Sequence, residues 1–148
     1  MSSLNEKIKL VEKILYGYKK SKIEIKNMYL DLEILENDYR GVGSIEYGEK
    51  SSKTYKFNSS VENEIVRREE DINKIKKKIR LKEIKVQKID DTIDVLSERE
   101  KYIVKEFYFN NNQIKYISMD LSLAETYCST LKTQALGKLI NYNILLNL

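Results

Sequence analysis

Several residue types are rare or missing in this chain, and each absence narrows its chemistry. The 148 residues contain no histidine, no proline, no tryptophan and a single cysteine, Cys128. Without histidine there is no imidazole to exchange protons near neutral pH, and neither a Cys/His zinc site nor an internal disulfide can form. We therefore expect no catalytic activity and no cofactor. With no proline and only five glycines, long uninterrupted helices are allowed.

Long apolar runs are also missing. No run approaches the roughly 18 residues needed to span a bilayer, and the N-terminal segment lacks the apolar centre of a signal peptide. We expect no membrane partner and a cytoplasmic location.

Charge is abundant, with 34% charged residues and a net charge of +4. Most basic residues are lysines, and the chain is also rich in Ile, Asn and Tyr. All four have A/T-rich codons, so a low-GC genome explains this composition without selection for nucleic-acid binding. The total charge is therefore weak evidence for a nucleic-acid partner.

Apolar residues recur with a heptad period in two long segments, which predicts an all-α fold. The first runs from Leu4 to Leu32 and the second from Ile65 to Leu96, and each is preceded by a capping box, Ser3 with Glu6 and Ser59 with Glu62. Their similar lengths predict a long antiparallel helical hairpin, a coiled-coil-like arm over residues 1–96. The seams either bury each other or join two copies in a homodimer. Lys22, Arg68 and Lys82 interrupt them.

Residues 39–60 form a long predicted connection within this arm. It contains three glycines and many serines, and its length is typical of a functional or disordered segment. A mobile loop is one interpretation. A small β-hairpin built from Ser44–Tyr47 and Thr54–Phe57, where polar and apolar residues alternate, is the other.

Basic residues concentrate on the second predicted helix between Lys74 and Lys88. This stretch is either a face that contacts phosphates or the solvated flank of a coiled coil, paired with acidic residues of the first helix. The candidate acidic partners are Glu24, Asp31, Glu33 and Glu36.

After Leu96 the pattern changes to three shorter helices. Ser97 and Glu100 form a capping box, three asparagines from Asn110 end the first helix, and Ser122 ends the second. Two short helices joined by a turn of about four residues are typical of a helix-turn-helix. Residues 97–148 are therefore predicted to form a separate module.

Three short motifs in this module carry a family resemblance. They are Leu-Ser-Glu-Arg-Glu at 96–100, Ile-Ser-Met-Asp-Leu-Ser-Leu at 117–123 and Ala-Leu-Gly-Lys-Leu at 135–139. The module resembles region 4 of bacterial sigma factors. With its long helical arm, the whole chain is similar to phage late-transcription regulators of the ArpU and RinA type.

The resemblance implies a sequence-specific, DNA-binding transcription regulator of a phage or prophage, an activator or sigma-like factor for late genes. Its implied partners are double-stranded promoter DNA and host RNA polymerase. Where the family has a turn glycine and a capping serine, this chain has Ser122 and Ala124, so we expect Ser122 and Glu125 to cap the third helix instead. Ser118 replaces a usual alanine.

The third helix is predicted to read DNA through its outward side chains, because Cys128 and Leu131 face inward. Lysines near it would contact phosphates. The predicted DNA-binding residues are Gln113, Lys115, Ala124, Glu125, Thr126, Ser129, Thr130, Lys132, Thr133 and Lys138.

Two other functions are compatible with this organisation. A DNA-packaging protein of the small-terminase kind also joins a helix-turn-helix to helical oligomerisation arms, although its DNA-binding module is usually N-terminal. A structural coiled-coil adaptor is the other. A ring of many copies would favour packaging, and a monomer or dimer would favour regulation.

Overall fold

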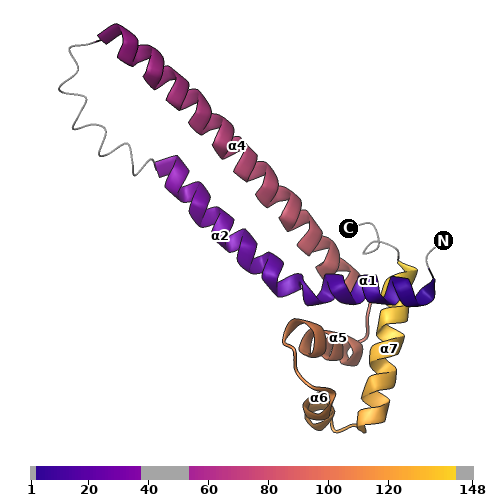
Figure 1. The fold of residues 1–148 in the computed structure, drawn as a ribbon. Helices are drawn as coiled ribbons and strands as arrows, with labels where there is room; N and C mark the ends of the chain where they lie inside the picture. Colours follow the sequence, from indigo (N-terminus) through magenta and orange to yellow (C-terminus); the bar gives the residue numbers. More distant parts are fainter. Residues whose placement is uncertain (1–2, 38–53, 143–148) are drawn as a thin grey trace. The chain divides into compact units, whose positions relative to one another are not determined.

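The computed structural model describes residues 3–37 and 54–142, with backbone alone for 54–60. The all-α prediction is confirmed, since these residues contain no strand. The helices, shown in Figure 1, are α1 (Leu4–Tyr16), α2 (Tyr18–Asn37), α4 (Thr54–Ile93), α5 (Glu98–Val104), the π-helical segment η1 (Lys105–Phe109), α6 (Ile114–Leu121) and α7 (Glu125–Asn141).

The chain divides into two compact units that differ from the predicted division at residue 96. Unit 1 comprises Met1–Lys22 and Ile84–Leu148, and unit 2 comprises Ile23–Glu83. The first helix, which we expected in the arm, packs instead against α7 and η1. An amphipathic helix buries its apolar stripe on whichever apolar surface is available, and periodicity alone does not identify that surface.

Unit 1 holds most of the buried side chains of the described residues. α1 contributes Val11 and Leu15, which are fully buried, and the end of α4 contributes Ile89 and Ile93. In Figure 1, α1 crosses α7 near the C-terminal end of α7, and the N-terminal end of α7 lies away from it. The N-terminal half of α7 is therefore free of α1.

Aromatic and polar contacts add directionality to the packing of α1 and of the first turn of α2. The hydroxyl of Tyr108, a buried residue, donates to Glu12 Oε2 at 2.9 Å. Tyr18 stacks on Phe109 with ring centroids 4.0 Å apart, and its hydroxyl donates to Asp90 Oδ1 at 2.6 Å. Buried hydroxyls need such acceptors, so these contacts restrict the orientation in which the helices can pack.

The first predicted helix is correct at its start and interrupted in its middle. The Ser3–Glu6 capping box forms, but α1 ends at Tyr16 and α2 begins at Tyr18. Gly17 between them keeps right-handed dihedral angles, and its carbonyl accepts from the Ser21 backbone N–H at 3.0 Å. Glycine lowers helix propensity, which explains a break at this position.

Unit 2 is formed by the remainder of α2 and the first three-quarters of α4. Lys82 Nζ lies 2.6 Å from Glu24 Oε2, and Lys76 Nζ lies 3.4 Å from Glu36 Oε1. A later residue of α2 thus pairs with an earlier residue of α4, so the two segments are antiparallel. Between them only Leu32 and Ile79 are buried among the described side chains.

The boundaries of the second long helix required correction. α4 begins at Thr54, so the expected start at Ser59 is wrong, and residues 54–60 of the predicted connection are helical. The β-hairpin interpretation of Thr54–Phe57 is therefore wrong. Its other half, Ser44–Tyr47, lies with residues 38–53 outside the described residues.

The predicted seams match the observed burial in part. Val11, Leu15, Leu32 and Ile79 are buried as expected, whereas Tyr29 is 46% exposed and Ile65 is 45% exposed. On α2 it is Met28, one residue before Tyr29, that is half-buried. A helix with 3.6 residues per turn drifts from a strict heptad, and this shifts which residue lies in the seam.

Candidate nucleic-acid interface

The last three helices surround a small apolar cluster of their own. Its fully buried members are Ile103 of α5, Ile117 of α6 and Cys128 of α7. Half-buried apolar side chains pack around them: Phe107, Ile114, Leu121, Leu123 and Leu131. Because Cys128 points into this cluster, the residues on the opposite side of α7 point away from it and remain exposed.

The turn between α6 and α7 has the geometry that glycine normally supplies. Ser122 has φ 56° and ψ 42°, in the left-handed region, and the Leu123 backbone N–H donates to the Ser118 carbonyl at 3.0 Å. The expectation that Ser122 and Glu125 cap α7 is wrong, because the residue at the N-cap is Ala124 and no side chain caps it. Serine tolerates this conformation at some cost in backbone strain.

Ser118 fits at the position where the family pattern has alanine. It is 4% exposed, and its hydroxyl donates to the Lys115 carbonyl at 2.7 Å. Because the hydroxyl is satisfied within its own helix, a polar residue is accommodated in this buried place.

The outward face of α7 carries most of the residues predicted to read DNA. All of the following are exposed: Ala124, Glu125, Thr126, Ser129, Thr130 and Thr133. The hydroxyls of Thr130 and Thr133 donate to the carbonyls of Thr126 and Ser129, at 3.0 and 3.1 Å. These hydroxyls can still accept a hydrogen bond, and the threonine methyl groups are available for apolar contact, as with thymine methyls.

Two exposed side chains at one edge of this face were missed by the sequence analysis. Tyr127 is 46% exposed, and Gln134 follows Thr130 by one helical turn. A helical projection of the sequence could have found both residues, because neither lies on the inward side marked by Cys128 and Leu131. Glutamine is a residue type that pairs with adenine through two hydrogen bonds.

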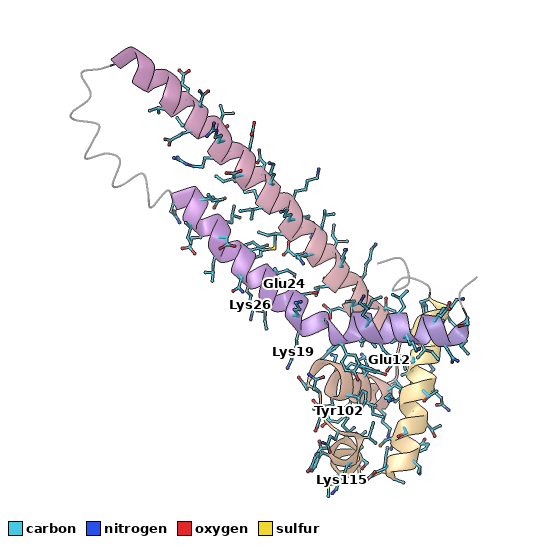
Figure 2. The ribbon with its side chains drawn as sticks, viewed as in Figure 1. Glu12, Lys19, Glu24, Lys26, Tyr102 and Lys115 are labelled. Atoms are coloured by element: carbon cyan, nitrogen blue, oxygen red, sulfur yellow. The ribbon has the colours of Figure 1, made fainter. Side chains whose placement is uncertain are left out.

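Two of the three lysines predicted to contact phosphates have partners on other elements of unit 1, and the third, Lys115, has its Nζ 6.0 Å from the ring centroid of the adjacent Tyr116. Lys138 Nζ lies 2.7 Å from Glu100 Oε1, and Lys132 Nζ lies 4.1 Å from the centroid of the Phe107 ring. Lys115 on α6, labelled in Figure 2, is exposed, as is Gln113 before it. The positive charge available to phosphates at this face is therefore smaller than the sequence suggested.

Glu100 is a buried carboxylate of this module, 2% exposed. Burial alone would raise the pKa of its carboxyl, but hydrogen bonds from Lys138 and Ser97 outweigh that effect and lower the pKa. The carboxylate thus links the start of α5 to the second half of α7. Its other oxygen, Oε2, is buried without a hydrogen-bond partner among the described residues.

The single cysteine is a core residue. Burial raises the pKa of the Cys128 thiol, and the charge of Glu125 raises it further. A buried thiol with a raised pKa remains protonated at neutral pH and is a poor nucleophile. This is the packing role expected from the sequence.

Among the described residues, no group of three or more His, Cys, Asp or Glu side chains is placed to hold a metal ion. None of the described helices combines the length and the apolar character that a membrane span requires. No protein-family model, curated protein or solved structure matches the chain.

Proposed function

We propose that the chain is a phage or prophage transcription regulator that binds double-stranded promoter DNA in a sequence-specific way. It acts as an activator or sigma-like factor for late genes, together with host RNA polymerase. It is a cytoplasmic protein without catalytic activity. Its DNA-reading element is α7, preceded by α6 and the turn at Ser122.

The observation that carries the proposal is the exposed polar face on the N-terminal half of α7. Thr126 and Thr130 lie four residues apart in this half, Gln134 follows four residues later just past the midpoint of α7, and all three are exposed. A recognition helix presents base-reading side chains from its N-terminal half in this way, with its core residues on the opposite side. Thr133 and Ser129 flank this line.

The small number of lysines free to contact phosphates limits the affinity of a single module for DNA. With Lys132 and Lys138 engaged in unit 1, a single module neutralises few phosphates, and each neutralised phosphate contributes to affinity by releasing counterions. One module should bind DNA weakly. A second DNA-binding module or a tether to RNA polymerase would supply the missing affinity by raising the local concentration.

The test is selection of the full-length protein against a random duplex library, followed by footprinting and run-off transcription with host polymerase. We expect one enriched site and activation at promoters that contain it. Gln134→Ala and Thr126→Ala should each weaken binding to that site about five- to fiftyfold, as the loss of one base contact does. Ser129→Ala should have a smaller effect because its hydroxyl lacks both the second hydrogen-bonding group of glutamine and the methyl group of threonine.

The matched control is Gln87→Ala, which removes an exposed glutamine from α4, where its amide donates to Asp91 at 2.7 Å. It should leave binding unchanged. Alanine raises helix propensity at all these positions, so loss of binding cannot be ascribed to unfolding of α7. Failure to enrich any site, or equal effects of Gln134→Ala and Gln87→Ala, would remove the proposal. A ring of many copies would point to DNA packaging instead.

A further inference from the structure

The outer face of α2 carries a second apolar stripe that the pairing with α4 does not use. Ile23, Leu30 and Ile34 are 58%, 58% and 47% exposed. Together with the exposed Asn27 they are spaced four, three and four residues apart, which is a heptad pattern of core positions. The residues that face α4 lie on the other side of the helix, with Leu32 at the centre.

Two exposed charged residues flank this stripe on opposite sides. Lys26 precedes Asn27 and lies on the side of α2 that faces away from α4, as Figure 2 shows. Asp31 follows Leu30. Neither side chain has a charged partner among the described residues. In heptad terms Lys26 is at g, Asn27 at a, Leu30 at d, Asp31 at e and Ile34 at a.

We propose that this stripe, residues 23–34 of α2, is the dimer interface of the protein and that its occupant is the same stripe of a second copy, aligned in parallel. In a parallel pair, g of one helix lies beside e of the next heptad on the other, so Lys26 meets Asp31 of the partner subunit twice. Asn27 meets its own counterpart at an a position, which specifies a two-stranded parallel register.

An antiparallel pair fits less well. It would bring Lys26 toward Glu33 of the partner subunit, which is favourable, but it would also bring Glu24 toward Asp31 of the partner subunit, which is repulsive. It would also place Asn27 opposite leucine, leaving the amide without a partner in the seam. Charge and the single polar core residue therefore both favour the parallel arrangement.

The sequence left open whether the heptad seams bury each other or join two copies, and the homodimer proposed here uses a different surface from those seams. The seams are used within unit 2, where Leu32 and Ile79 are 8% and 3% exposed. The stripe proposed here is short, and such an interface lies at or below the area of about 1,200 Å² that stable complexes bury. We expect a dissociation constant on the order of 10 µM.

The test is sedimentation equilibrium of the full-length protein from 1 to about 200 µM, with helix content checked by circular dichroism. Wild-type protein should be in monomer–dimer equilibrium. Leu30→Lys should abolish the dimer while preserving helix content, because this side chain is 58% exposed in the monomer. Leu81→Lys, at a residue 55% exposed on α4, is the matched control and should dimerise normally.

Charge exchange tests the orientation. Lys26→Glu and Asp31→Lys should each weaken self-association about tenfold, because each replaces two attractive pairs by repulsive ones. Mixed in equal amounts, the two variants should form a heterodimer as tight as the wild-type dimer. A wild-type chain that remains monomeric, a dimer insensitive to Leu30→Lys, an assembly larger than a dimer, or no recovery on mixing would each overturn the proposal.

Discussion

The two units of this chain differ in how they bury apolar side chains. Unit 1 combines several helices, and residues such as Ile103, Val104, Tyr108 and Leu139 are almost completely covered. The described residues of unit 2 form two helical segments, and of their side chains only Leu32 and Ile79 are buried. Two helices can cover only one line of residues on each other, whereas several helices can enclose a core from all sides. A second apolar stripe therefore remains exposed in unit 2.

The largest expected effect comes from replacing one buried isoleucine in each unit by alanine and comparing the losses of stability. Ile103→Ala should reduce the stability of unit 1 by about 3–4 kcal/mol, because the fully enclosed site cannot collapse around the cavity. Ile79→Ala should cost unit 2 only about 1–2 kcal/mol, since two helices can approach each other to close the gap. Native-state hydrogen exchange measures both effects, because it reports each unit separately. Equal losses would contradict the contrast.

A second prediction concerns the buried carboxylate of unit 1. Glu100→Gln should reduce stability by about 1–3 kcal/mol, because Lys138 then loses its charged acceptor. Glu98→Gln, in which the changed side chain is 94% exposed, should have almost no effect. Urea unfolding of the two variants at pH 7 makes the comparison.

The ionisation of Glu100 should also make the free energy of unfolding depend on pH. The pKa of Glu100 is lower in the folded chain than its ordinary value of 4.5, so its contribution is complete above about pH 4.5 and disappears as the pH falls through the folded pKa. Wild-type protein should therefore begin to lose its advantage over Glu100→Gln as the pH falls below about 4.5, and should lose it fully below the folded pKa. A difference that stays constant over this range would show that the ion pair is not its source.

The smallest effect is expected in unit 2. The Lys82–Glu24 pair is short, but both side chains are 38% exposed, so water and salt screen their attraction. Lys82→Gln should destabilise unit 2 by less than about 1 kcal/mol, and the effect should shrink further in 0.5 M salt. Lys77→Gln, at an exposed residue of the same helix, is the control. Salt-dependent hydrogen exchange in α4 would report the difference.

Local signals in the sequence were reliable wherever one residue type decides the backbone. The capping boxes Ser3–Glu6 and Ser97–Glu100 both form, and the asparagine run contains Asn111 with φ 53°. Each depends on a side chain bonding to its own neighbourhood, so no distant partner is needed. Such features can be predicted without knowledge of the fold.

Signals that depend on competition between elements were less reliable. The serine at 59 and glutamate at 62 look like a helix start, yet α4 already begins at Thr54. Ser122 looked like a cap for α7, but it completes the end of α6 in a left-handed conformation. In each case two neighbouring structures can use the same residue, and sequence spacing does not decide between them.

The candidate DNA-binding face shows the same limit. Periodicity correctly placed Thr126, Ser129, Thr130 and Thr133 on the exposed side of α7. It could not indicate that Lys132 lies over the Phe107 ring or that Lys138 pairs with Glu100. Long lysine side chains reach whichever partner the packing provides, and those partners come from other helices.

The residues alone determined that this chain would be helical, where α1, α5 and α6 begin, and which side of most helices is apolar, because these properties arise within a few turns of one segment. Which apolar surface each stripe would meet was decided only by packing. α1 joined the C-terminal helices, and α2 was left with one stripe covered by α4 and another exposed. Burial is non-directional, so many pairings satisfy the same pattern, and only the complete set of contacts selects one.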